Sequence, residues 1–292
     1  MMNRNFRFLV TILSIFTASF AFIGGDCTTD SENPPIAGGV GAPANLTLTI
    51  DANPGGSSFA IISWDASTNE SDDNFRGYRI STYQLDSTNA VDTLLSSDQV
   101  SKTTRIHTVS DVQRNVRYRT YVVAELNDGS RSDSVATPVY GGIFYNNNGS
   151  IDEYMASGPA ESGYGWDVFT GAGTQYAYTA GNAANIDIHL RDDNGQLTFY
   201  SPNIQSPGTK TTLFRLIGTG DDAFDQTELE EPDQTSIAVN DDEVYLIRTD
   251  EGNYIKIWIS QISDVGSPAY SNVRFEYKVQ PIQGLRVLKH NP

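Results

Sequence analysis

The chain has 292 residues, with 36 acidic side chains against 19 basic ones and a formal net charge of -17. This excess of negative charge argues against nucleic acid and against an anionic membrane surface as partners, because both attract clusters of Lys and Arg. The single cysteine excludes an internal disulfide, so two domains of ordinary size must each depend on a hydrophobic core.

Residues 1–26 are predicted to be a secretory signal peptide. Arg4 and Arg7 precede an apolar run over 8–23, and small residues follow it. Cys27 comes directly afterwards, so the segment resembles a bacterial lipoprotein signal. The resemblance implies that Cys27 is lipidated and anchors the chain to the outer membrane or cell surface of a Gram-negative bacterium.

Asp26 departs from the small residue that usually precedes the lipidated cysteine. One alternative is cleavage by an ordinary signal peptidase after Ala21, which would give a secreted or periplasmic protein. Another is an uncleaved membrane helix, although the apolar run is shorter than the roughly 20 residues that a span needs. Residues 27–42 are polar and rich in Pro and Gly, which is typical of a flexible tether.

Residues 43–139 form a series of short alternating segments separated by turns. This spacing indicates an all-β sandwich. The expected strands are 44–50, 59–64, 75–83, 104–109, 116–126 and 134–139.

The same region resembles a fibronectin type III domain. The residues that carry the resemblance are Trp64, Gly77-Tyr78-Arg79-Ile80, Val112, Tyr118, Val122, Ala124, Asn127, Gly129, Ser132 and Ser134. Arg114 stands where that family usually has proline. The resemblance implies structural roles for Trp64, Tyr78 and Tyr118. Trp64 would fill the space between the sheets, and the Tyr118 hydroxyl would bond the backbone at a corner.

Residues 140–292 are predicted to form a second antiparallel β domain. Its expected strands are 163–169, 185–190, 196–200, 212–217, 243–249, 253–262 and 272–279. The turn 192–195 and the turn 250–252 each have the composition that joins two strands of a hairpin.

Two parts of this second domain, 166–169 and the hairpin 244–257, resemble segments of the HmuY-type haem-binding lipoproteins. Haem capture in that family uses a pair of axial histidines. The chain has His107, His189 and His290, and no pair can be mapped from the sequence. Haem or small-ligand scavenging is therefore an alternative function.

The most acidic stretch lies between Arg215 and Arg248. Because calcium prefers six to eight oxygen ligands, Asp221, Asp222 and Asp225 are candidate calcium ligands, against the alternative of a solvated acidic loop. A smaller cluster is formed by Glu70, Asp72 and Asp73. No other cofactor is indicated.

The sequence lacks the common nucleophile, zinc and phosphate motifs of enzymes, so the chain is predicted to be non-catalytic. The favoured function is binding or interaction at the cell surface, with a protein or a polysaccharide as partner. A polysaccharide accessory or glycan-acting enzyme is a further alternative. The aromatic candidates for stacking on sugars are Tyr164, Trp166, Tyr176, Tyr178 and Trp258.

Overall fold

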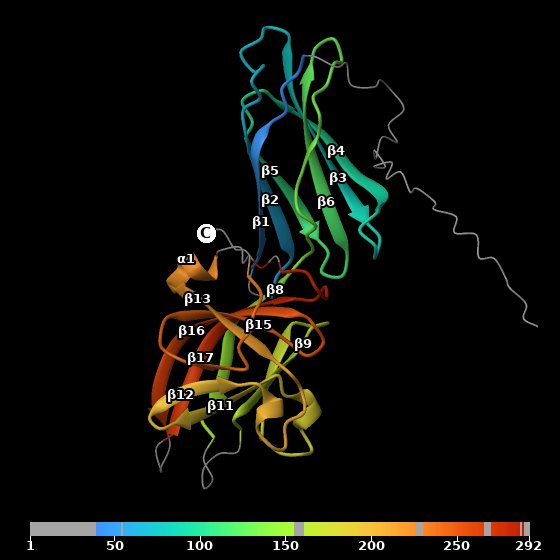
Figure 1. Cartoon of the computed structure of the whole chain (residues 1–292). Coiled ribbons are helices and arrows are strands. Elements are labelled where there is room, and N and C mark those ends of the chain that lie inside the picture. The colour runs from blue at the N-terminus through green and yellow to red at the C-terminus, as the bar shows by residue number, and fades with distance from the viewer. Residues whose placement is uncertain are drawn as a thin grey trace, which may run out of the picture. The chain divides into compact units, whose positions relative to one another are not determined.

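A computed structural model describes residues 39–53, 55–154, 161–225, 230–265, 270–286 and 288. The predicted signal peptide, Cys27 and His290 lie outside these residues. The described residues belong to one compact unit and are built almost entirely from antiparallel strands, which confirms the all-β prediction (Figure 1). Within this part of the chain, no helix has the length and apolar character needed to cross a bilayer.

The first half of the described chain is a sandwich of two sheets (Figure 1). The three-stranded sheet has the order β1-β2-β5, with β1 at Ala44–Ala52, β2 at Ser58–Asp65 and β5 at Ile106–Val112. The four-stranded sheet has the order β4-β3-β6-β7, with β4 at Val91–Ser101, β3 at Phe75–Leu85, β6 at Arg117–Leu126 and β7 at Val135–Ala136. Alternate residues of β2 are buried, because one face of the strand packs against the opposite sheet.

Strand β4 was not among the strands predicted from the sequence. It pairs with β3 along its length, yet nearly every one of its side chains is exposed or only half-buried. Because it buries no apolar face, its sequence lacks the alternation by which the other strands can be identified.

The second half is also a sandwich of two sheets. One has the order β10-β9-β11-β12-β14, with β10 at Ala172–Tyr176, β9 at Gly163–Asp167, β11 at Ile188–Asp193, β12 at Gln196–Tyr200 and β14 at Ser236–Ala238. The other has the order β13-β15-β16-β17-β8, with β13 at Leu213–Thr219, β15 at Glu243–Arg248, β16 at Tyr254–Val265, β17 at Tyr270–Gln280 and β8 at Phe144–Asp152. A large aromatic and aliphatic core fills the space between them.

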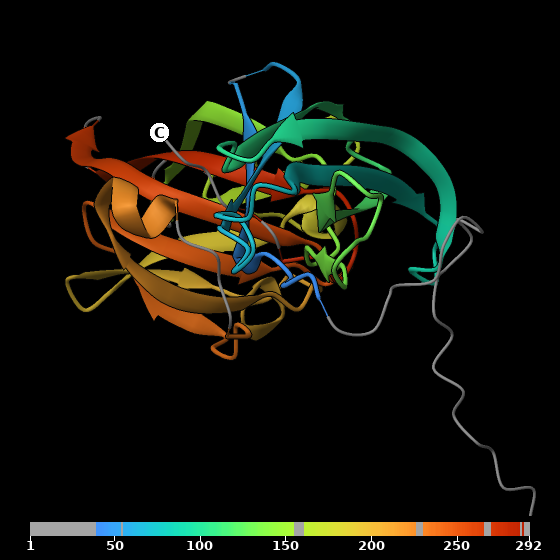
Figure 2. The same cartoon turned by 90° about the horizontal axis from the view of Figure 1, so that it is seen from above.

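Strand β16 shows how the second sheet uses both of its faces. Ile255 and Ile257 point into the core between the sheets, whereas Lys256 is buried on the opposite face. The short helix α1 (Gly220–Phe224) lies over strands of this sheet (Figure 2). The Phe224 carbonyl at its end accepts hydrogen bonds from Lys256 and Lys278, at 3.0 and 3.1 Å. Two short 3-10 turns complete the described structure, η1 at Ala183–Asn185 and η2 at Pro202–Ile204.

Arg114, which replaces the proline usual at this position, connects the first sandwich to the residues that follow it. Its guanidinium donates to the Ile143 carbonyl at 3.1 Å and to the Gly56 carbonyl. It also lies 4.2 Å from the centre of the Phe144 ring, within the range of a cation–π contact. A proline could make none of these contacts. One buried cluster also joins residues of both sandwiches, namely Ile50, Ala52, Tyr118, Tyr140, Leu246, Tyr254 and Leu288.

Candidate functional site

A groove of about 560 Å³ lies between the edges of the two sheets of the first sandwich, where β4 and β5 face each other. Its walls carry both apolar and polar side chains. They include Leu95, Asp98, His107, Val109, Val112 and Tyr118.

Both strands beside the groove are sheet edges. Within the described residues, β4 pairs only with β3 and β5 pairs only with β2. An edge strand presents unpaired backbone N–H and C=O groups to its surroundings. Natural edges are commonly protected by charged side chains, proline or β-bulges. Over its 11 residues β4 has no Lys or Pro, but it carries Asp92 and Asp98, and two irregularities interrupt its pairing with β3.

Large apolar side chains are exposed along the same two edges. Leu94 and Leu95 on β4 are 46% and 50% exposed, and Ile106 on β5 is 61% exposed. Among the described residues of the first sandwich, these are the large apolar side chains that lie open to solvent. Of these three side chains, Leu95 lines the groove, and Leu94 is its neighbour on β4.

A β-bulge explains why two successive leucines are exposed on β4. The register pairs Ser96 with Thr82 and Leu94 with Tyr83, so Leu95 has no partner on β3. The extra residue of a bulge re-aims the side chains around it. Leu95 consequently lines the groove.

His107 and Asp98 approach each other across the groove, with the Nε2 and Oδ2 atoms 3.7 Å apart. Burial lowers the pKa of His107 below its usual value, and the opposing influence of Asp98 is the smaller of the two. The His107 imidazole is therefore mainly neutral at pH 7 and does not form a charged pair with Asp98.

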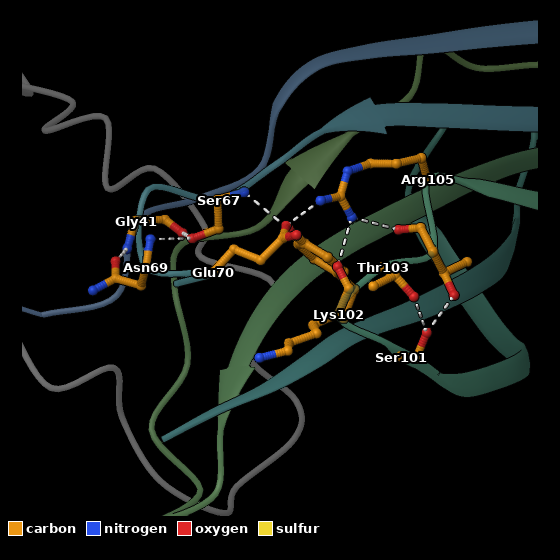
Figure 3. Close-up of polar contacts among 10 residues, drawn as sticks. Gly41, Ser67, Asn69, Glu70, Ser101, Lys102, Thr103 and Arg105 are labelled. Carbon is orange, nitrogen blue, oxygen red and sulfur yellow. Dashed lines mark hydrogen bonds and ion pairs between the residues drawn. The ribbon is translucent and has the colours of Figure 1, made fainter. Parts of the chain in front are cut away.

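The turn that links β4 to β5 is held in place by a polar cluster, drawn in Figure 3. The Arg105 guanidinium donates to the carbonyls of Lys102 and Thr104, at 2.7 and 2.8 Å, and pairs with the Glu70 carboxylate. The Tyr78 hydroxyl donates to the same carboxylate at 2.8 Å. Glu70, from the smaller acidic cluster of the sequence, therefore holds the turn between β4 and β5, whereas Asp72 and Asp73 are exposed.

The three residues with predicted structural roles lie within the first sandwich. Trp64 and Tyr78 are 3% and 0% exposed, and their rings meet edge to face at 5.5 Å. Tyr118 is 5% exposed, and its hydroxyl accepts a hydrogen bond from the Gln113 backbone N–H at 3.2 Å. Tyr118 also lines the groove, so the same side chain holds the backbone at Gln113 and forms part of the groove wall.

The candidate calcium ligands lie on and beside α1. Asp221 and Asp222 are in its first turn, and Asp225 follows its end. The Asp225 carboxylate pairs with the buried Lys278 ammonium at 3.1 Å. In the part of the chain that the structure describes, no three His, Cys, Asp or Glu side chains form a group that could hold a metal ion. The arrangement gives the predicted calcium site no support.

The described histidines do not form an axial pair. His189 is 1% exposed, its ring stacks on Tyr178 at 3.7 Å, and Tyr154 meets it edge to face. Its Nδ1 lies 3.0 Å from the Ser162 carbonyl, which makes Nδ1 the protonated nitrogen. His107 belongs to the other sandwich. A haem iron binds a ring nitrogen, and the burial of His189 keeps its ring out of reach of such a ligand.

The aromatic residues considered for sugar binding are mostly internal. Tyr164, Trp166 and Tyr178 are 3%, 8% and 8% exposed. The Tyr178 hydroxyl donates to the Pro202 and Gln205 carbonyls instead. Tyr176 and Trp258 are half-buried. These rings do not form an exposed platform.

Comparison with known proteins identifies the first sandwich. The family described as fibronectin type III domain matches residues 41–139, so this part of the chain is a fibronectin type III domain, a fold of general binding and interaction modules. None of the curated proteins matches the chain significantly.

Solved structures show limited similarity. One described as a myokine structure is 25% identical, covers 36% of this chain and 98% of its own, and has a TM-score of 0.27. The FN5 domain of Drosophila Lar is 23% identical, with coverage of 36% and 100% and a TM-score of 0.25. The assignment of residues 41–139 to the fibronectin type III domain rests on the family match.

Proposed function

We propose that the protein is an exported, lipid-anchored and non-catalytic interaction protein, whose fibronectin type III domain binds an extended segment of a partner protein in the groove between β4 and β5. The observation that carries this proposal is the coincidence of two open sheet edges, a groove between them and exposed leucines along one edge. An added strand would satisfy the free backbone groups of β4, and its side chains would enter the groove.

Substitution of Leu95 by arginine is expected to weaken binding of such a segment by at least about tenfold, because a charge would replace an apolar contact beside the groove. Eleven-residue peptides, matching the length of β4, would be selected from a random library on the wild-type chain. Their affinities would then be measured for the wild type and for Leu95→Arg.

Leu216→Arg is the matched control, because Leu216 is 46% exposed but lies on β13 of the second sandwich. Its binding should equal that of the wild type. If selected peptides bind Leu95→Arg and the wild type equally, the groove is not the binding site.

The anchor can be tested separately. Full-length protein expressed in a Gram-negative host with labelled palmitate is expected to carry the label, and Cys27→Ser is expected to lose it and leave the membrane fraction. N-terminal sequencing of the purified product adds a second measurement. A mature chain that begins at Phe22 without label would contradict lipidation and show ordinary signal-peptidase cleavage.

A further inference from the structure

Three side chains from separate segments of the second sandwich meet around one amine. Lys210 lies in the segment before β13, Asp187 directly before β11, and Glu251 in the turn between β15 and β16. The Lys210 Nζ is 2.9 Å from Asp187 Oδ1 and 2.7 Å from Glu251 Oε1. Asp187 is 1% exposed, whereas the Glu251 side chain is 52% exposed and reaches solvent.

The second oxygen of Asp187 has its own donor. The Trp166 backbone N–H donates to Oδ2 at 2.8 Å. The Asp187 carboxyl therefore has an amine against one oxygen and a fixed N–H against the other. A fixed donor of this kind stabilises negative charge that develops on an oxygen when a nucleophile attacks the carbon.

The protonation states of the two carboxyl groups favour reaction of Lys210 with Asp187 rather than with Glu251. Burial raises the pKa of Asp187 above its usual value, although Lys210 acts in the opposite direction. Burial also acts to raise the pKa of Glu251, but the hydrogen bond and the charge of Lys210, together with hydrogen bonds from the Glu251 backbone and Thr249, outweigh it and the pKa is lowered. The buried carboxyl is thus the easier one to hold neutral, and Glu251 is the carboxyl that stays ionised and can accept a proton. Burial acts to lower the pKa of Lys210, but Asp187 and Glu251 together raise it, so its amine needs such an acceptor before it can attack.

We propose that Lys210 and Asp187 condense to form an intramolecular isopeptide bond. Glu251 takes a proton from the Lys210 ammonium, and the free Nζ attacks Cγ of the protonated Asp187. Oδ2 carries the developing negative charge against the Trp166 N–H. Oδ1, which carries the acid proton of Asp187, leaves as water after receiving the proton from Glu251. Glu251 then takes the second proton from Nζ and releases it to solvent, which its half-exposed side chain reaches. One C–N bond forms, one C–O bond breaks, and one water is released, so no oxidant or co-reactant is needed.

The fold supplies the conditions for this condensation. The three groups are held in contact by the strands that carry them, which gives the high effective concentration of an intramolecular reaction. The product is a neutral amide in place of an ammonium held against a buried carboxyl group, and a buried charge carries a large desolvation cost. The bond would join the start of β11 in one sheet to the segment entering β13 in the other, in a chain without a disulfide.

A second buried lysine provides an internal comparison. Lys278 contacts Asp225 at 3.1 Å, but its other hydrogen-bond acceptor is the Phe224 carbonyl and not a carboxylate. Burial lowers the pKa of Lys278 to about 8, so its amine loses a proton more readily than that of Lys210, whereas two carboxylates are among the described contacts of Lys210 and one is among those of Lys278. Condensation is expected at Lys210 and not at Lys278.

The test is mass spectrometry of the purified full chain before and after trypsin. Formation of the bond makes the protein about 18 Da lighter, the mass of one water. Trypsin cannot cleave after an acylated lysine, so residues 192–215 should be recovered as one peptide joined to residues 132–191. Free peptides 192–210 and 211–215 from the wild type, together with an unchanged intact mass, would overturn the proposal.

Two variants resolve the roles of the groups. Lys210→Arg keeps a cation beside both carboxylates but is expected to show no loss of water and no joined peptide. Glu251→Gln keeps a side chain of the same size and is expected to form the bond at least about a hundredfold more slowly, because the proton acceptor is gone. Circular dichroism would confirm that both variants fold. Bond formation in Glu251→Gln at the wild-type rate would contradict the part given to Glu251.

Discussion

Replacement of Trp64 by alanine is expected to destabilise the fibronectin type III domain by about 3–5 kcal/mol, the usual cost of truncating a buried aromatic residue. Trp64 is 3% exposed and packs in one cluster with Phe75, Tyr78, Ile80 and other buried residues from both sheets. Truncation would remove the edge-to-face contact with Tyr78 and leave a cavity between the sheets.

The measurement is urea unfolding of the full chain followed by circular dichroism, because tryptophan fluorescence would change with the substitution itself. Ile106→Ala is the control, since this side chain is 61% exposed on the edge strand β5 and should change stability by less than about 0.5 kcal/mol. Equal unfolding midpoints for Trp64→Ala and the wild type would show that Trp64 does not hold the two sheets together.

Acidification is expected to destabilise the second sandwich through His189. Burial lowers the pKa of His189 to about 4, from an ordinary value of 6.5. Between these two values the unfolded chain binds a proton at this site and the folded chain does not. The free energy of unfolding therefore falls as the pH drops from 6.5 towards 4, by on the order of 3 kcal/mol over the whole interval.

The matched variant is His189→Gln, which keeps an N–H donor for the Ser162 carbonyl but does not titrate. Urea unfolding of both proteins at several pH values between 4 and 7 separates the histidine from the many carboxylates, because the carboxylates contribute to both proteins equally. As the pH drops from 6.5 towards 4, the unfolding free energy of the wild type should fall relative to that of His189→Gln. A constant difference would mean that His189 is free to take a proton in the folded protein.

Local patterns in the sequence determined the class of fold and its first domain. Alternation of apolar residues identified β2 and β3, and the positions of Trp64, Tyr78 and Tyr118 identified the fibronectin type III domain. The hairpin of β15 and β16 was equally clear from the turn composition of residues 250–252, and Gly252 adopts a positive φ of 80° in that turn. Such signals are local, since side-chain alternation and turn composition depend on neighbouring residues alone.

Only the tertiary structure decided the groove and the Lys210 site. Strand β4 was not predicted, because an exposed edge strand buries neither of its faces. Leu95 becomes part of a groove only when β4 is placed beside β5 in the folded domain. Asp187, Lys210 and Glu251 are far apart in the sequence, and each occurs in an ordinary polar context. Their meeting depends on the order and register of strands in two sheets, which are set by long-range pairing and packing that no local pattern of residues specifies.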